Sequence, residues 1–355
     1  MTPLAHLLAG QIAQTGPITL ADYMQTALLH PQYGYYATRD PLGAAGDFTT
    51  APEISQMFGE LVGLCLAQAW LDQGAPAPFA LVELGPGRGT LMADVLRATK
   101  AVPGFHEAMR ITLMEVSQPL REAQARVIGR DDLRWVAAPS LLPEDMPLFL
   151  IANEFFDALP LRQFHRAGGM WRETMVGIGG DGALRLGLSD PKPLLELEER
   201  LADTKEGDIV EVAPLGTVVA QAVGARIAAQ GGAALIVDYG DWRSLGDTFQ
   251  AVKAHEPVDP LAEPGLADLT AHVDFERIAA AAPCAHTRLT TQGTFLERLG
   301  IGPRAAKLAE RLEGEALESH MAAYRRLTHR DEMGTLFKIL GLYPHGAAPP
   351  PGLDA

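Results

Sequence analysis

The chain has 355 residues, of which 47% are hydrophobic and 21% charged, so it can form a large core and one to three domains. It carries 29 basic and 44 acidic residues, a net charge of −15, and no block of Lys and Arg stands out. This charge makes nucleic acid a poor candidate partner and a cationic peptide a better one. The two cysteines, Cys65 and Cys284, form neither a disulfide framework nor a metal-binding pattern, and we expect no metal.

The N-terminal segment lacks the basic region of a secretion signal and is not rich in arginine. No apolar stretch reaches the length that is needed to cross a membrane. We therefore expect a reduced bacterial protein that resides in the cytoplasm and does not insert stably into a membrane.

Residues 1–40 are predicted to be helical and then turn-rich, with apolar residues at helical spacing over 18–29. A polar, glycine-flanked loop follows, which contains Asp47, Thr49 and Thr50, and another helix is predicted to begin around Pro52. Two interpretations of this segment stand. Either the loop folds over a cofactor, or Glu53 simply interacts with the helix dipole.

The stretch 80–97 predicts a strand, a glycine turn and a helix, the unit that binds nucleotide-like cofactors in open α/β sheets. Gly85, Gly87 and Gly89 stand at alternate positions in this turn. Glycines let the backbone turn sharply, and they let a ligand approach without a Cβ in the way.

The spacing of this turn discriminates between cofactors. A pyrophosphate-binding turn usually reads G-x-G-x-x-G, whereas here the third glycine comes one residue early. Glu83 precedes the turn, and Pro86 within it has no N–H to offer. These features favour a cofactor that carries a cation, such as the amino-acid end and sulfonium of S-adenosylmethionine. The alternative is a glycine-rich turn without a ligand.

Residues 111–117 predict an apolar strand that ends in Glu115, followed by a helix over 118–128 and a third strand over 133–137. An acid at the end of the second strand of a Rossmann-like unit typically accepts hydrogen bonds from ribose hydroxyls. We therefore place Glu115 and its neighbour Val116 among the cofactor-binding candidates.

The stretch 148–160 is a buried-strand pattern that ends abruptly in Asn153 and Glu154 and then Asp157. The catalytic crevice of an open parallel sheet lies outside the carboxyl ends of its strands. These three groups therefore predict a partly desolvated acidic pocket. The alternative is a strand end whose acids cap a helix.

The segment 161–232 departs from simple alternation and is interpreted as an insertion between two core strands. Its expected elements are strands over 161–165, 170–176 and 183–188, a helix over 192–201, an extended segment over 208–212 and a helix over 215–230. The parallel sheet is predicted to resume with a buried strand over 233–238, which ends in Asp238.

Residues 268–275 are expected to open a helix that continues through 282. A capping role for Thr270 or Asp274 is the simpler interpretation of their polar side chains, and His272 as an active-site group is the alternative. Strands over 286–292 and 335–340 are predicted to form the antiparallel pair that closes a seven-stranded sheet. The Pro/Gly-rich tail from residue 344 is expected to be disordered.

With these motifs together, the chain resembles the MidA family, which includes a mitochondrial complex I assembly factor with protein arginine methyltransferase activity. The resemblance covers nearly the whole chain and rests on a set of stretches in family order. They are MQTALLHPQYGYY, GDFTTAPEISQMFGE, VELGPGRGTL, MEVSQPLREAQ, NEFFDALP, IVDYG, DLTAHVDF, QGTFLERLGI and MGTLFKIL. One departure is Gln250, which stands where a basic residue is common, while Lys253 and His255 remain.

The resemblance implies an α/β fold with the Rossmann-like, seven-stranded sheet of a class I methyltransferase, added N-terminal helices and an inserted α+β segment. The implied parts are an N-terminal helical segment with the lid loop (1–70), the cofactor-binding half (71–160), an inserted substrate-side segment (161–232), the second half of the sheet with inserted helices (233–343) and the tail (344–355).

The implied reaction is methyl transfer from S-adenosylmethionine to an arginine of a respiratory complex I (NADH-quinone oxidoreductase) subunit, with S-adenosylhomocysteine as the product. Three rivals stay open. They are a non-catalytic assembly chaperone with a methyltransferase fold, a methyltransferase for another protein or a small molecule, and a nicotinamide-dependent oxidoreductase.

The candidate residues fall into two groups. Those for the cofactor are Asp47, Thr49, Thr50, Glu83, Gly85, Gly87, Gly89, Glu115 and Val116. Those for catalysis are Asn153, Glu154, Asp157 and His272, with Asp238 as a further candidate.

Overall fold

The computed structural model describes residues 2–38 and 49–355, and the chain divides into two compact units. The insertion unit comprises Met1–Phe48, Asp157–Gly216 and Arg243–Asp274. The sheet unit comprises Thr49–Phe156, Thr217–Trp242 and Phe275–Ala355. This division differs from the expected five segments, because the N-terminal helices share a unit with the inserted segment.

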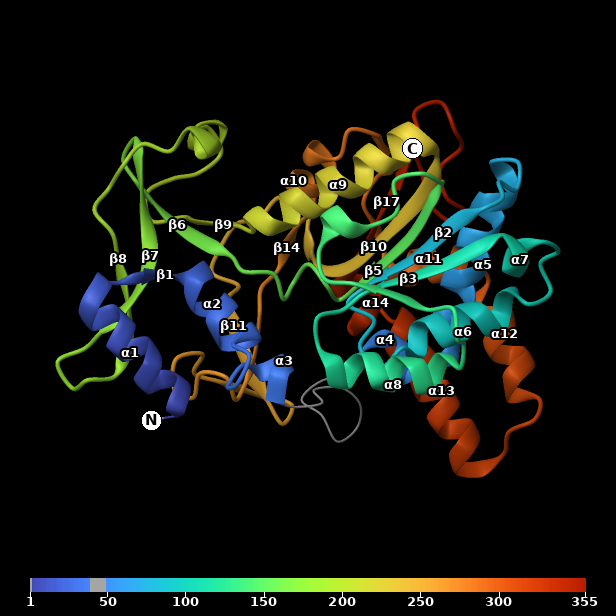
Figure 1. Ribbon diagram of the computed structural model, residues 1–355, viewed down its shortest axis with the longest axis horizontal. Coiled ribbons are helices and arrows are strands. Elements are labelled where there is room, and N and C mark those ends of the chain that lie inside the picture. The colour runs from blue at the N-terminus through green and yellow to red at the C-terminus, as the bar shows by residue number, and fades with distance from the viewer. Residues whose placement is uncertain (1, 39–48) are drawn as a thin grey trace. The chain divides into compact units, whose positions relative to one another are not determined.

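A mostly parallel sheet forms the centre of the sheet unit, with strand order β4-β3-β2-β5-β10-β17 (Figure 1). The first five of these strands run parallel to one another, and β17 is antiparallel to β10. Short strands β15 and β16 both pair with β17. The predicted α/β class is therefore confirmed. The bounds are β2 (Phe79–Leu84), β3 (Met109–Met114), β4 (Arg134–Val136), β5 (Leu148–Asn153), β10 (Gly232–Asp241), β15 (Ala285–His286), β16 (Thr290–Thr291) and β17 (Phe337–Tyr343).

The order of the strands fixes where a ligand can bind. Strand β2 has β3 on one side and β5 on the other, so the direction of winding reverses between β2 and β5. Ligands of open α/β sheets bind outside the carboxyl ends of the strands at such a point. The segments that follow β2, β3, β5 and β10 therefore meet at one edge, which we call the carboxyl edge.

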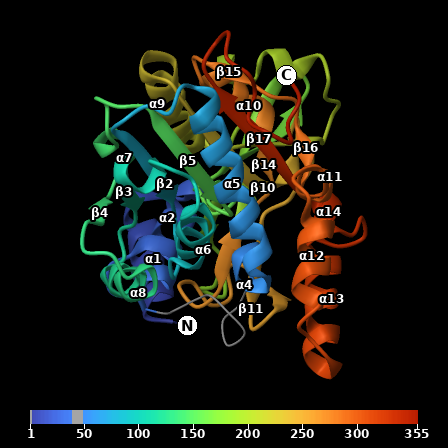
Figure 2. The same cartoon turned by 90° about the vertical axis from the view of Figure 1, so that its right-hand side faces the viewer.

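Helices cover this sheet, and Figure 2 shows α5 running across it in the foreground. The helices of the unit are α4 (Ala51–Ile54), α5 (Gln56–Asp72), α6 (Thr90–Thr99), α7 (Phe105–Ala108), α8 (Gln118–Ile128), α9 (Pro214–Gln230, from Thr217 on), α10 (Phe275–Ala281), α11 (Gln292–Arg298), α12 (Ile301–Ala309), α13 (Gly314–Thr328) and α14 (Met333–Leu336), with a 3-10 turn η1 (Pro139–Leu141).

Two glycines let α5 and α6 pack closely. A Cβ at Gly59 would lie 2.6 Å from the Asp94 Cβ, and a Cβ at Gly63 would lie 2.8 Å from the Val95 Cα. Both distances are far below van der Waals contact, so larger residues would force the helices apart. The glycine turn leads directly into α6, and this packing therefore supports the turn.

The insertion unit contains an antiparallel sheet with the order β1-β7-β6-β9, and β8 pairs with β7. The N-terminal helices bury Leu8, Tyr23 and Met24 in a core that also includes Val176 of β7. The bounds are α1 (Pro3–Thr15), β1 (Ile18–Thr19), α2 (Leu20–Leu29), α3 (Tyr35–Thr38), β6 (Arg162–Ala167), β7 (Met170–Ile178), β8 (Leu184–Leu188) and β9 (Ile209–Val212).

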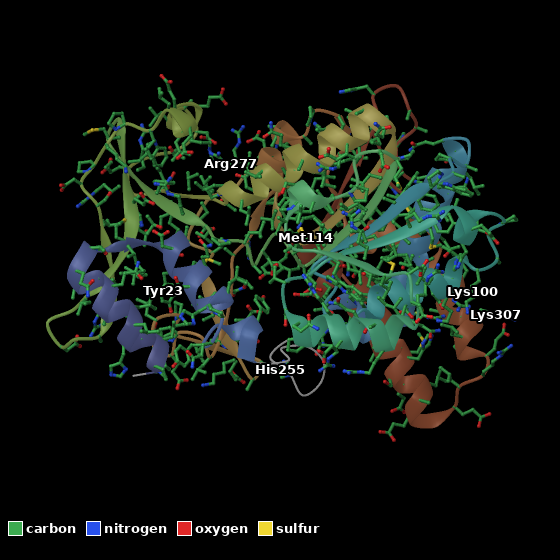
Figure 3. All side chains as sticks on the ribbon, in the orientation of Figure 1. Tyr23, Lys100, Met114, His255, Arg277 and Lys307 are labelled. Carbon is green, nitrogen blue, oxygen red and sulfur yellow. The ribbon has the colours of Figure 1, made fainter. Side chains whose placement is uncertain are left out.

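A second antiparallel sheet of this unit has the order β12-β11-β13, from β11 (Gln250–Lys253), β12 (Glu256–Val258) and β13 (Asp268–Thr270), and β14 (Val273–Asp274) follows. Ala254 and His255, the latter labelled in Figure 3, turn the chain from β11 to β12 with φ of 51° and 64°. Gln250 lies opposite Thr270, and its Nε2 donates to the Thr270 Oγ1 at 3.3 Å. Gln250, which departs from the family pattern, is therefore an exposed residue of strand β11 that bonds to the neighbouring strand β13.

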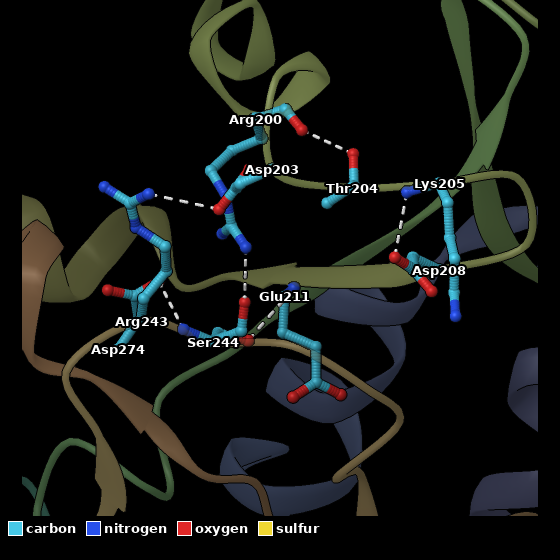
Figure 4. Close-up of polar contacts among 9 residues, drawn as sticks. All are labelled: Arg200, Asp203, Thr204, Lys205, Asp208, Glu211, Arg243, Ser244 and Asp274. Carbon is cyan, nitrogen blue, oxygen red and sulfur yellow. Dashed lines mark hydrogen bonds and ion pairs between the residues drawn. The ribbon is translucent and has the colours of Figure 1, made fainter.

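A polar network fastens the segment after Arg243 to the rest of the insertion unit (Figure 4). Arg200 is 6% exposed, and its guanidinium donates through Nε to Asp203 at 3.0 Å and through Nη2 to the Ser244 carbonyl at 2.8 Å. Arg243 also bonds to Asp203 at 3.1 Å, and the Ser244 N–H donates to Asp274 at 3.0 Å. Buried charges of this kind are stable only when they are paired.

The helix predicted over 192–201 is wrong, because the structure has two 3-10 turns there, η2 (Leu195–Leu197) and η3 (Glu199–Leu201). Pro191 and Pro193 cannot donate hydrogen bonds in a helix. Leu197 and Arg200 are the buried residues of the two turns, so the segment lacks the apolar face of an α-helix.

Other boundaries also move. The helix expected from residue 268 begins at Phe275, because Asp268–Thr270 pairs with β11 as a strand. The strand expected over 286–292 is split into β15 and β16, and Gln292 already begins α11. The strand expected over 335–340 begins at Phe337, after α14. Residues 18–19 form β1 before helix α2 begins at Leu20.

The C-terminal segment 344–355, which was expected to be disordered, packs against the sheet unit in the structure. Leu353 is 6% exposed and belongs to the main core. Pro351 accepts a hydrogen bond from the Cys65 Sγ at 3.3 Å, and Asp354 pairs with Arg298 at 2.8 Å. Composition alone missed these contacts, since they involve residues that are distant in the sequence.

Among the described residues, none of the helices combines the length and the apolar character that a membrane crossing requires.

Candidate functional site

The turn from β2 to α6 needs its three glycines. Gly85, Gly87 and Gly89 have φ of 61°, 52° and 89°, in the left-handed region that favours glycine. The Gly85 N–H donates to the carbonyl of Met114, labelled in Figure 3, at 3.1 Å. This bond ties the start of the turn to the end of β3.

The turn also leaves little space for side chains. A Cβ at Gly85 would lie 3.0 Å from the Phe155 Cδ2, and a Cβ at Gly89 would lie 3.2 Å from the Gln124 Cα. Each distance is tighter than nearly all real Cβ contacts, and the neighbour of Gly89 is backbone. Gly85 and Gly89 therefore have no room for a larger residue, which adds to the conformational reason for glycine at both positions.

Glu83 at the end of β2 is 3% exposed, and burial raises its pKa to about 8, against the lowering effect of a hydrogen bond from the Met92 backbone. Its Oε2 is buried and has no hydrogen-bond partner among the described residues. A buried carboxyl oxygen of this kind costs stability unless a donor or cation reaches it. Glu83 thus fits the cationic amino-acid end of S-adenosylmethionine.

Glu115 follows β3 and is 9% exposed. Its Oε1 accepts a hydrogen bond from the Ser117 N–H at 2.8 Å, and its Oε2 accepts one from the Gln124 Nε2 at 3.3 Å. Burial raises the pKa of Glu115, and these donors lower it. The Val116 backbone also donates to this carboxylate, which is thus held in one orientation. Its neighbour Val116 is 58% exposed.

Asn153 is the last residue of β5, and Glu154 follows it. The Glu154 Oε1 accepts hydrogen bonds from the Asn153 Nδ2 and from the Ala51 N–H, each at 3.2 Å. The second bond satisfies an N–H at the start of α4 that has no partner within the helix. Glu154 therefore does cap a helix, as the alternative interpretation of this strand end predicted. Glu154 has a φ of 50°, which is rare for a residue with a side chain, and the buried Asn153 Oδ1 has no hydrogen-bond partner among the described residues.

Thr50 is the N-cap residue of α4, and its carbonyl accepts the Glu53 N–H at 2.9 Å. Glu53 in turn accepts a hydrogen bond from the Thr90 hydroxyl at 2.7 Å, at the first residue of α6. Glu53 therefore joins α4 to the end of the glycine turn. Thr49 directly precedes Thr50, whereas Asp47 lies outside the described residues.

Asp238, in the C-terminal part of β10, is fully buried and accepts three backbone hydrogen bonds. Two come from Phe155 and Phe156 at 3.2 and 2.9 Å, and one from Tyr239 at 3.0 Å. These bonds fix the backbone that follows Glu154. Asp238 is thus a positioning residue for that segment.

Asp157 and His272 belong to the insertion unit. The Asp157 carbonyl accepts the Ala271 N–H at 3.0 Å, and the His272 N–H donates to the Thr248 Oγ1 at 2.9 Å. Asp157 is 7% exposed, whereas the His272 side chain is exposed. The predicted site residues are therefore divided, with the glycines, Glu83, Glu115, Asn153 and Glu154 at the carboxyl edge of the sheet unit.

Sequence reasoning missed Gln124, which is fully buried and bonds to both Glu115 and the Gly87 carbonyl. One signal was available in the sequence. Gln124 stands four residues after Leu120, at helical spacing, and these two are the buried residues of α8. A glutamine at a core position of a helix needs polar partners in the fold.

A family model described as "Putative S-adenosyl-L-methionine-dependent methyltransferase" matches residues 61–294. The mitochondrial protein arginine methyltransferase NDUFAF7 of Mus musculus is 37% identical over 372 residues, which cover 97% of this chain and 85% of that protein. The Drosophila melanogaster homolog is 38% identical over 387 residues, which cover 96% and 85% of the two chains.

A crystal structure of a Burkholderia thailandensis protein bound to S-adenosyl-homocysteine matches with a TM-score of 0.83 and 29% identity, over 99% of this chain and 92% of that one. The cofactor prediction agrees with this match and with the family model: the enzyme uses S-adenosylmethionine.

The expectation of a bacterial cytoplasmic protein is wrong, as the comparison with curated relatives shows. The curated relatives that match almost the whole chain are mitochondrial proteins of eukaryotes. Composition could not reveal this, because the absence of an N-terminal signal pattern says nothing about the location of relatives.

The fold, the glycine turn and these matches agree, and the chain belongs to the MidA-like family of S-adenosyl-L-methionine-dependent methyltransferases.

Proposed function

We propose that this methyltransferase modifies an arginine side chain of a protein, and that Asn153 and Glu154 hold the acceptor guanidinium. The printed names of the relatives support an arginine acceptor. The observation that carries the proposal is the pair of polar side chains at the end of β5, next to β2 and its glycine turn. The resemblance to the MidA family adds a subunit of respiratory complex I as the protein substrate.

For the cofactor, we propose that Glu115 accepts hydrogen bonds from the ribose hydroxyls and that Val116 packs against the base. Glu83 and the glycine turn would receive the amino-acid end, and Thr49 and Thr50 would lie beside it at the start of α4. The fixed orientation of the Glu115 carboxylate and the buried, unpartnered Glu83 Oε2 support these roles.

The chemistry explains why an acidic acceptor site is needed. The guanidinium is protonated near pH 7 and is a poor nucleophile. A carboxylate can hold it through paired hydrogen bonds and concentrate its electron density on one nitrogen. The bound cofactor supplies a methyl group on a sulfonium, and transfer of that group to the nitrogen leaves neutral S-adenosylhomocysteine.

In this scheme the chain has to position the acceptor and take up one proton. Glu154 accepts hydrogen bonds from the guanidinium, and the buried Asn153 Oδ1 accepts another. The proton that leaves the methylated nitrogen passes to Glu154 and then to water.

The test is Glu154→Gln, because glutamine keeps the oxygen that accepts the Ala51 N–H and removes the charge. We expect unchanged affinity for S-adenosylhomocysteine by calorimetry and a loss of methyl transfer of about 100-fold or more, with tritiated cofactor and an arginine peptide. Glu122→Gln on the exposed face of α8 is the matched control. Full turnover by Glu154→Gln would remove the acceptor role.

A second experiment addresses the substrate. Mass spectrometry of arginine methylation in complex I, with the wild-type protein and with Gly85→Val, should show one site that is lost in the variant. Normal assembly of complex I with Gly85→Val would favour the rival interpretation, a non-catalytic assembly chaperone.

A further inference from the structure

Gln124 on α8 makes three side-chain hydrogen bonds while it is fully buried. Its Nε2 donates to the Gly87 carbonyl at 2.8 Å and to the Glu115 Oε2 at 3.3 Å. Its Oε1 accepts a hydrogen bond from the Trp135 Nε1 of β4 at 2.8 Å. One amide thus connects the glycine turn, the end of β3 and β4.

The orientation of this amide follows from its neighbours. The indole N–H of Trp135 can only donate, so the oxygen of Gln124 must face it. The two protons of Nε2 then point to the Gly87 carbonyl and the Glu115 carboxylate, which can only accept while Glu115 is ionised. The opposite orientation would place an oxygen against two acceptors, and it is excluded.

A neutral donor suits this position. Glu115 is mostly buried, and its other oxygen is held by the Ser117 N–H. The Arg121 guanidinium donates to the Glu115 backbone carbonyl, so among these contacts it is Gln124 that supplies the side-chain donor to the carboxylate. Removal of Gln124 would leave the Oε2 without this donor and would also free the Gly87 peptide.

We propose that Gln124 is a positioning residue for the cofactor, which holds the Glu115 carboxylate and the Gly87 peptide in one fixed arrangement. The ribose end and the amino-acid end of the cofactor then bind to a site that is already formed, so little conformational entropy is lost on binding. This inference rests on the ribose role that is proposed for Glu115.

The first test is calorimetric binding of S-adenosylhomocysteine to Gln124→Leu, which keeps the size of the side chain and removes its hydrogen bonds. We expect a loss of affinity of about tenfold. Gln118→Leu, an exposed glutamine on the same helix, should bind as the wild type does. Wild-type affinity in a Gln124→Leu protein with an unchanged melting temperature would overturn the proposal.

The second test separates positioning from packing through pH. In Gln124→Glu the new carboxyl faces the Glu115 carboxylate and the Gly87 carbonyl, with the Trp135 N–H and the Arg121 guanidinium as the nearby donors. When it is protonated it can still donate, and when it is ionised it repels Glu115. Affinity should therefore fall more than tenfold at pH 8 and recover toward the wild-type value at pH 5.5. If the ratio of the wild-type affinity to the Gln124→Glu affinity is the same at both pH values, the proposal is contradicted. This test does not depend on whether Gln124→Leu folds.

A double-mutant cycle identifies which assignment fails. If Gln124 acts through Glu115, Gln124→Leu should cost at least threefold less in a Glu115→Ala background than in the wild type. Equal costs in both backgrounds would overturn the role of Gln124 alone. If Glu115→Ala by itself binds S-adenosylhomocysteine as tightly as the wild type, the ribose assignment fails, and the inference fails with it.

Discussion

The two halves of the carboxyl edge carry similar acids but use them differently. In the β2–β3 half, the Glu115 carboxylate is held by the Ser117 N–H and by Gln124, and we propose that it also accepts hydrogen bonds from a ligand. In the β5–β10 half, Asp238 is occupied by three backbone N–H groups, and Glu154 binds the start of α4. The position of an acid at the end of a strand therefore does not identify it as a ligand-binding residue. The hydrogen bonds that it already accepts within the protein also have to be known.

Each half also contains a buried oxygen that has no hydrogen-bond partner among the described residues. In the β2–β3 half the Glu83 Oε2 and the Ser117 Oγ are such atoms, and in the β5–β10 half the Asn153 Oδ1 is one. Such atoms are costly in the protein alone and gain most from a bound donor. In our proposal, the Glu83 Oε2 receives the cofactor and the Asn153 Oδ1 receives the acceptor guanidinium.

The largest expected effect is on stability in the β5–β10 half. Asp238→Asn places an amide N–H against backbone donors that now bind a carboxylate, and we expect it to lower the free energy of unfolding by about 3 kcal/mol in urea denaturation. Asp241→Asn, at the exposed end of the same strand, should cost less than about 1 kcal/mol. Equal losses would mean that the three backbone bonds of Asp238 contribute little.

The next effect is on binding in the β2–β3 half. Glu115→Ala should weaken the binding of S-adenosylhomocysteine by about 1.5–3 kcal/mol, because hydrogen bonds to a charged group are lost. Isothermal titration calorimetry measures this directly, with Glu122→Ala of α8 as the control. An unchanged dissociation constant would remove Glu115 from the ribose role and erase the difference between the two halves.

The smallest effect sharpens the comparison through pH. Burial raises the pKa of Glu83 to about 8, so between its ordinary value of 4.5 and that value the folded chain binds a proton that the unfolded chain releases. Stability should then fall as the pH rises through this window. The glutamine of Glu83→Gln does not titrate, so only the wild type loses stability as the pH rises. The melting temperature of the variant minus that of the wild type should therefore be about 2–4 °C larger at pH 8.5 than at pH 5.

Differential scanning fluorimetry without ligand measures this shift, and Glu122→Gln should show the same difference from the wild type at both pH values. A constant offset for Glu83→Gln would mean that the Glu83 carboxyl is ionised in the fold at both pH values. Bound S-adenosylmethionine should reduce the advantage of Glu83→Gln, since its ammonium would partner the wild-type carboxylate.

Much of the sheet was readable from the sequence, because buried parallel strands are continuous apolar runs and the glycine turn is local. The strands that lead to Gly85, Glu115, Asn153 and Asp238 are all present, although β3 (Met109–Met114) ends before Glu115 and β10 (Gly232–Asp241) continues beyond Asp238. The fold class follows from their alternation with helices.

The failures share a cause, which is dependence on partners that are distant in the sequence. Asp268–Thr270 is a strand because it pairs with β11, and the tail packs because Leu353 enters the main core. The functions of Asp238 and Gln124 likewise depend on backbone groups of other elements. Local patterns give the positions of polar residues at strand ends, but they do not say which are already satisfied.

The most direct measurement is a crystal structure of the protein with S-adenosylhomocysteine. The account predicts that both ribose hydroxyls bind the Glu115 carboxylate at about 2.7 Å, with Gln124 still bonded to it, and that the amino group reaches Glu83 beside the glycine turn. A ligand bound away from the β2–β3 half, or a ribose without contact to Glu115, would contradict it.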